Sequence, residues 1–114
     1  MKALLTVLMA AAPVPAMAAP VNLTCTLDDR GKAVPMELAL NEDASTVSFH
    51  WPVNGSRGVQ RAVFLPTEVT FMSFKIDRRS LKVERVNDRY DQEKLGKPPV
   101  TTGTCELVKV DRAF

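Results

Sequence analysis

The densest group of side chains that could do chemistry lies in FKIDRRSLKV, residues 74–83, which holds two arginines, an aspartate and a serine. Apolar and polar residues alternate on both sides of residues 77–80, as in two strands joined by a turn. An aspartate at the first turn position accepts hydrogen bonds from backbone N–H groups two residues on, and serine acts similarly. The Asp-Arg pair recurs at residues 29–30, 88–89 and 111–112, near predicted turns and strand ends. We therefore interpret residues 77–80 as a hairpin turn.

Positive charge in the middle of the chain gives this stretch a second interpretation. Residues 57–89 contain eight Lys or Arg and four Asp or Glu, whereas the whole chain has a net charge of +2. Such a basic sector could attract an anionic envelope component, such as a cell-wall polymer or lipopolysaccharide, or an acidic protein. We expect Arg78, Arg79 and Arg85 to carry that attraction. Nucleic acid is not expected as a partner, because the excess is small and Tyr90 is the only nearby aromatic residue that could stack on bases.

The sequence is poor in motifs for catalysis or metal binding. His50 is the only histidine and the chain has two cysteines, so a zinc site with three or four ligands is not expected. A Ser-His-acid triad would have to use His50, and no serine lies in a nucleophile elbow. We expect no enzyme activity and no cofactor. A small hydrolase that uses His50, or one with paired carboxylates, is the enzymatic alternative.

The start of the chain has the features of a secretory signal peptide. Met1-Lys2 is positively charged, residues 3–12 form an apolar run, and Ala16-Met17-Ala18 supplies the small-x-small pattern of a cleavage site. A transmembrane anchor would need roughly 20 apolar residues, and no later segment is long enough for stable membrane insertion. We predict a signal peptide at residues 1–18 and one domain at residues 19–114. That domain would be periplasmic or secreted.

The two cysteines predict one disulfide. Cys25 lies near the start of the mature chain and Cys105 near its end, and in an oxidising compartment such a pair is typically bridged. A redox pair, the alternative, usually reads C-x-x-C. The bridge would close a loop of about 80 residues and contribute roughly 4–5 kcal/mol of stability in the chain-entropy model, less any strain.

Alternating apolar residues predict an all-β fold, in which Val47, Phe49 and Trp51 share a face and His50 lies on the polar face. We expect a small antiparallel sandwich or barrel of six to seven strands, closed by the disulfide. Residues 87–99 break the pattern, and are either a long loop or a connector with one or two helical turns at residues 89–95; a functional role and a solvated connector both stay open. The predicted strands are residues 21–27, 34–40, 47–51, 60–65, 68–76, 81–86 and 102–110.

Two family resemblances add to this interpretation. The combination of residues 74–81, FKIDRRSL, with the late Gly103-Thr104-Cys105 resembles a group of small exported proteobacterial proteins of unknown function. That resemblance covers the C-terminal third of the chain. It implies an exported β-rich domain and no particular activity.

The general plan is also similar to the periplasmic and membrane-bound inhibitors of C-type lysozyme, small β-barrels with an early and a late cysteine. Leu23-Thr24-Cys25-Thr26-Leu27 through Gly31 resembles their opening strand and turn. That family inserts a Ser-Gly-Ser-Gly-Ala-Lys/Arg-Tyr type of loop into the lysozyme cleft. The nearest segment here, residues 54–58, shares only a Gly-Ser and a nearby base, so Ser56 and Arg57 are the candidate positions. We therefore expect a non-enzymatic binding or structural domain with an unknown ligand, or alternatively an inhibitor of an envelope-attacking hydrolase such as C-type lysozyme.

Overall fold

The chain folds into one antiparallel β-sheet with a short helix, as a computed structural model shows for residues 20–108. The predicted signal peptide at residues 1–18 lies outside these residues. The strands are β1 (Val21–Asp29), β2 (Lys32–Asn41), β3 (Thr46–Trp51), β4 (Ser56–Arg61), β5 (Val63–Phe64), β6 (Glu68–Phe71), β7 (Phe74–Asp77), β8 (Lys82–Val86) and β9 (Val100–Leu107), with helix α1 (Arg89–Lys94) between β8 and β9.

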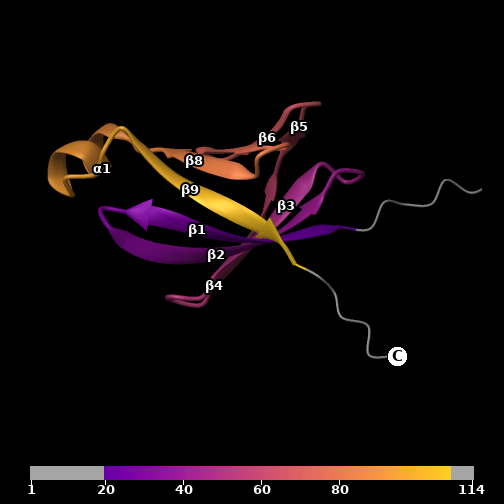
Figure 1. Cartoon of the computed structure of the whole chain (residues 1–114), viewed down its shortest axis with the longest axis horizontal. Coiled ribbons are helices and arrows are strands. Elements are labelled where there is room, and N and C mark those ends of the chain that lie inside the picture. Colours follow the sequence, from indigo (N-terminus) through magenta and orange to yellow (C-terminus); the bar gives the residue numbers. More distant parts are fainter. Residues whose placement is uncertain (1–19, 109–114) are drawn as a thin grey trace, which may run out of the picture.

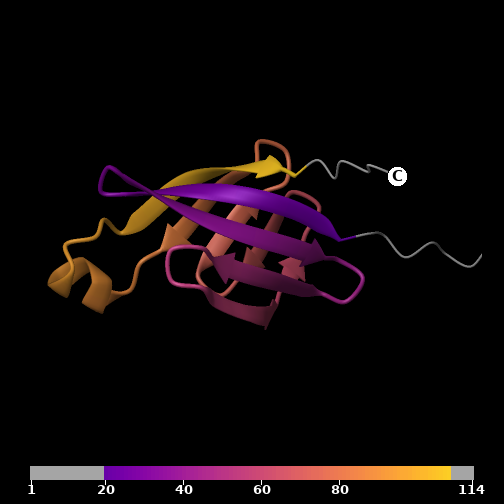
Figure 2. The ribbon, with the colours of Figure 1, turned by 90° about the horizontal axis from the view of Figure 1, so that it is seen from below.

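The sheet curls toward a barrel because its first and last strands pair with each other. The strand order is β4-β3-β2-β1-β9-β8-β7-β6-β5, so β4 and β5 form the two edges although only Ala62 separates them in the chain. Figures 1 and 2 show β1 and β2 in one layer and β6 and β8 in the other, with β9 joining them. Helix α1 lies at one end of the barrel, and the chain enters β1 and leaves β9 at the other end (Figure 1).

The core lies between the layers and follows the two-residue period of the strands. Inward-facing residues of β1 and β2, such as Leu23 and Met36, are almost completely buried, and their outward-facing neighbours are largely exposed. In β3, Val47 is buried, and Phe49 and Trp51 pack against the core from the same face, as predicted. The buried core residues are Leu23, Cys25, Leu27, Met36, Leu38, Leu40, Val47, Ala62, Val69, Phe71, Phe74, Ile76, Val83 and Cys105.

The predicted disulfide is confirmed. Cys25 in β1 and Cys105 in β9 are direct cross-strand partners, and their sulfur atoms are bonded. Both residues are buried. The bridge therefore covalently joins the first and last strands at the seam that brings the two halves of the sheet together.

The expected number of strands was wrong, because the described chain forms nine rather than six to seven. The segment 68–76 is a hairpin: Met72 has a φ of 50° and lies with Ser73 between β6 and β7. No glycine, proline or asparagine marks this turn. Its only sequence signal is that Phe71 and Phe74, both buried, are three positions apart, whereas residues on one face of a continuous strand are an even number apart. The segment 60–65 divides near Ala62, where the chain passes from one sheet edge to the other.

The segment 87–99 contains the helical turns that were predicted as one of its two forms. Asp88 caps α1 by accepting a hydrogen bond from the Asp91 backbone N–H at 2.7 Å. The buried Asn87 side chain donates to Pro98 O and to Thr101 Oγ1, each at 2.8 Å. Arg30 in the β1–β2 turn donates to Leu95 O. The segment is therefore attached to the barrel at both of its ends.

Candidate functional site

The five predicted binding residues lie in three separate places. Ser56 and Arg57 begin β4, Arg78 and Arg79 lie in the β7–β8 turn, and Arg85 lies in β8. The β7–β8 turn belongs to the end of the barrel where β1 starts, whereas Arg57 is paired with His50 near the opposite end of β3. The basic sector of the sequence therefore does not form one continuous patch.

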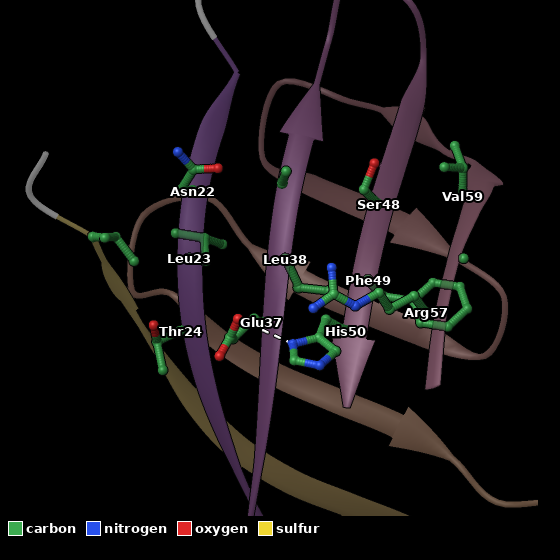
Figure 3. Close-up of a pocket in the computed structure, with 13 residues that line it drawn as sticks. Asn22, Leu23, Thr24, Glu37, Leu38, Ser48, Phe49, His50, Arg57 and Val59 are labelled. Carbon is green, nitrogen blue, oxygen red and sulfur yellow. Dashed lines mark hydrogen bonds and ion pairs between the residues drawn. The ribbon is translucent and has the colours of Figure 1, made fainter. Parts of the chain in front are cut away.

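A groove of about 740 Å³ crosses the outer face of β1–β4 (Figure 3). Strand register builds it, because directly paired residues point to the same face of a sheet. Thr24, Glu37, His50 and Arg57 are successive cross-strand partners and form one row of it. A second row of smaller or apolar side chains consists of Asn22, Ala39, Ser48 and Val59.

Charged groups meet at one side of this groove. His50 Nδ1 lies 3.2 Å from Glu37 Oε2, and the His50 side chain is 25% exposed. Figure 3 shows the Arg57 side chain extending across β3, with its guanidinium group on the same face as these two residues. Arg57 has no hydrogen-bond or ion-pair partner among residues 20–108. Its guanidinium group is therefore available to an external anion or hydrogen-bond acceptor.

Phe49 supports the groove from the inner side of the sheet. A Cβ atom at Gly58 would lie 2.6 Å from Cζ of the Phe49 ring. The absence of a side chain at Gly58 lets the ring lie directly against the β4 backbone, which is a common role of glycine in strands. The β3–β4 ladder holds β4 beside β3, and this contact packs the Phe49 ring against β4 next to Arg57.

Of the segment 54–58, which the resemblance compares with an inhibitory loop, only Asn54 and Gly55 lie in a turn. Trp51 pairs with Ser56, and Gly55 has a φ of 73°, so a tight turn connects β3 directly to β4. Asn54 Oδ1 accepts a hydrogen bond from the Ser56 backbone N–H at 2.8 Å. Ser56, Arg57 and Gly58 are strand residues, and Arg57 acts from the face of the sheet.

The residues around His50 do not form a catalytic triad. Ser48 is on the same face of β3, two residues before His50, but within residues 20–108 no serine or threonine hydroxyl is hydrogen-bonded to the imidazole. The same residues contain no group of three or more His, Cys, Asp or Glu side chains that could hold a metal ion.

Arg78 lies at the end of the barrel where β1 begins and joins the two halves of the sheet. Its guanidinium group donates to Glu42 Oε1 at 2.8 Å and to Leu65 O at 2.9 Å. Glu42 follows β2, whereas Leu65 follows β5 at the sheet edge. Sequence inspection could not have found this partner of Arg78, because 36 residues separate the two ion-pair residues.

A second pocket, of about 340 Å³, opens beside this ion pair. Buried core side chains from three strands, Leu23, Val69 and Ile76, form part of its wall. Arg78, Arg79 and Glu42 supply its charged residues. The remaining residues that line it are Val21, Leu40, Phe64, Leu81 and Leu107.

Arg85 points toward the interior of the barrel and does not line the pocket beside Arg78. Its partners in the ladders are Phe74 and Thr101, and its Cζ atom lies 5.5 Å from the centre of the Phe74 ring. This distance allows a cation–π attraction. The buried Nε atom has no hydrogen-bond partner in the described part of the chain. Arg85 is thus an inward-facing residue and cannot act together with Arg57 or Arg79.

The residues 77–80 form the turn that their sequence predicts. Asp77 Oδ1 accepts hydrogen bonds from the Arg79 and Ser80 backbone N–H groups, at 2.8 and 2.9 Å. The hydrogen bond from Ser80, followed by that from Arg79, holds the pKa of Asp77 below its usual value of 3.8. The aspartate therefore has a structural role in its ionised form.

We expect Asp77→Ala to lower the free energy of unfolding at neutral pH, because two turn N–H groups lose their acceptor. The pKa of Asp77 is lower in the folded chain than in the unfolded chain, so its contribution is complete above the unfolded pKa of 3.8. The contribution is lost as pH falls through the lower folded pKa. Urea midpoints measured from neutral pH down to about pH 2 should therefore converge for the two proteins at the acid end. A constant difference across this range would contradict this assignment.

Comparison with family models, with curated proteins and with solved structures finds no match to this chain. Within residues 20–108 no helix has the length and apolar character needed to cross a membrane. The disulfide is compatible with an oxidising, extracytoplasmic environment.

Proposed function

We propose that the protein is an exported, non-enzymatic binding domain whose partner lies in the groove on the outer face of β1–β4. The observation that carries this proposal is the unpartnered Arg57 guanidinium group beside the paired Glu37 and His50. The signal-like start of the sequence and the disulfide support export. The partner is an anionic component of the cell envelope or a protein segment with an acidic group.

The shape and chemistry of the groove support a partner that is extended. The groove crosses four strands and is open to solvent, so a polymer or a peptide segment can lie along it without entering the core. Small side chains such as Ala39 and Ser48 leave room at its centre. Arg57 can form two parallel hydrogen bonds to a carboxylate or phosphate, because its guanidinium group presents a planar fork of donors.

We expect Arg57→Ala to reduce binding to isolated cell envelope about tenfold, since a hydrogen bond to a charged group contributes an amount of this order. Cosedimentation of the oxidised protein with envelope fragments would measure the bound fraction. Arg61→Ala is the matched control, because it removes the same charge from the same strand outside the groove. No cosedimentation, or equal losses in both variants, would contradict the proposed groove.

The alternative function is inhibition of an envelope-attacking hydrolase, with C-type lysozyme as the first candidate. The position of Arg57 beside the tight β3–β4 turn favours it, because Arg57 lines one end of the groove next to that turn. Ser56, its neighbour in β4, points to the other face of the sheet. Titration of the oxidised protein into C-type lysozyme would test it through the rate of cell-wall lysis. An inhibitor should stop lysis at a near-stoichiometric ratio and lose potency on Arg57→Ala with an unchanged circular dichroism spectrum. Full lysis at a large excess would exclude lysozyme as the target.

A further inference from the structure

The pocket at the barrel end where β1 begins differs in character from the outer groove. It is smaller, about 340 Å³, and it reaches residues of the hydrophobic core. Ile76 and Leu23, which line it, are each 1% exposed. A volume of this size is at the lower end of the range for small-molecule sites in proteins. The pocket therefore suits a slender apolar group.

Apolar side chains at the mouth of this pocket are exposed to solvent. Val21, the first residue of β1, is 44% exposed, and Leu107, the last residue of β9, is 62% exposed. Both line the pocket, together with the half-buried Phe64 and Leu81. Exposed apolar residues that continue into a pocket and are bordered by charged groups are typical of a ligand site.

The charge at the mouth is positive. Arg78 is neutralised by Glu42, with 2.8 Å between Nη2 and Oε1. Arg79 forms no side-chain hydrogen bond or ion pair with residues 20–108 beyond a weak Coulombic attraction to Asp77, whose carboxylate already accepts two backbone N–H groups. One unpaired guanidinium group thus stands at the opening of an apolar pocket.

We propose that this pocket binds the acyl chain of a medium-length carboxylate, with Arg79 as the partner of the carboxylate group. The acyl chain lies against Leu23, Val69 and Ile76. The carboxylate stays at the mouth, where solvent and the Arg79 guanidinium group hold it. A guanidinium–carboxylate pair can form two hydrogen bonds and fixes the orientation of such an amphiphile. This site is separate from the outer groove, so it does not depend on the function proposed for Arg57.

Isothermal titration of the oxidised protein with sodium decanoate below its micelle concentration tests the proposal, and amide chemical shifts locate the site. We expect saturable binding, with the largest shifts around Val69, Ile76 and Arg79. Arg79→Ala should weaken binding about tenfold, and Arg57→Ala should leave it unchanged. Leu107→Glu should also weaken binding, because it places a negative charge at an exposed mouth position where the fold tolerates substitution.

Related amphiphiles separate the contributions of chain and charge. Decanol and decyltrimethylammonium should bind at least tenfold more weakly than decanoate, and butanoate should not bind detectably. The proposal is overturned if decanoate gives no heat and no shifts, if the cationic amphiphile binds equally well, or if decyl phosphate binds more tightly than decanoate. Decanoate binding that appears only after deletion of residues 109–114 would overturn the proposal and make that segment the occupant of the pocket. Decanoate binding that appears only on dilution of a self-associated protein would overturn it as well and make a second copy of the chain the occupant.

Discussion

Reduction of the Cys25–Cys105 bridge is expected to lower the free energy of unfolding by about 4 kcal/mol. The bridge connects residues 80 positions apart, and a closed loop of this length restricts the unfolded chain by about that amount. A domain of this size has a total stability of only about 5–15 kcal/mol. The thermal midpoint should therefore fall by roughly 20 °C or more, since each kcal/mol shifts it by several degrees. Denaturant unfolding of the oxidised and the reduced protein would measure the difference.

The comparison must separate the loss of the bond from the loss of the sulfur atoms. Cys25 is completely buried, so a Cys25→Ala, Cys105→Ala variant also leaves a small cavity in the core. The chemically reduced wild-type protein keeps both sulfur atoms and is the cleaner test. The β1–β9 ladder, which extends to both sides of the bridge, should keep the reduced protein folded in the absence of denaturant. Identical midpoints for the oxidised and reduced forms would contradict the stabilising role of the bridge.

Gly103→Ala is expected to destabilise the fold by about 3 kcal/mol, which is large for the addition of one methyl group. A Cβ atom at this position would lie 2.3 Å from the Thr26 carbonyl oxygen and 2.9 Å from Leu27 Cα. Both atoms belong to the backbone of β1, which cannot move without disturbing the strand pairing next to the disulfide. Gly103 pairs with Leu27 on one side and with Val83 on the other. The close approach of β1 and β9 therefore requires glycine here.

Gly58→Ala is the matched control for this prediction. Its added Cβ would lie 2.6 Å from a Phe49 ring atom, but that atom is the far end of a side chain that can rotate. We expect a cost of about 1 kcal/mol, at the low end for overpacking. Urea unfolding of both variants at neutral pH would give the two values. Equal destabilisation would show that the backbone contact at Gly103 has no special effect.

The sequence by itself determined the all-β class, the disulfide and the turn at residues 77–80. These features depend on local chemistry or on simple counting: a two-residue period of apolar side chains, two widely spaced cysteines, and an aspartate placed to accept turn N–H groups. Asp77 does so through Arg79 and Ser80. The hairpin at Met72 was not foreseen because a non-glycine residue with positive φ leaves no compositional signal.

Only the tertiary structure decided which side chains meet. Strand order separates Arg57 in β4 from Arg79 and Arg85 on the β7–β8 hairpin, although all three belong to one basic sector of the sequence. It also brings Glu37 to His50 and Glu42 to Arg78, pairs that are 13 and 36 residues apart. The alternation of residues indicates that a side chain points inward or outward, but the neighbours across a strand depend on register and on the curvature of the whole sheet. For this reason the outer groove follows from the register of β1–β4, and the pocket at the barrel end follows from the pairing of β1 with β9. No local motif encodes either of them.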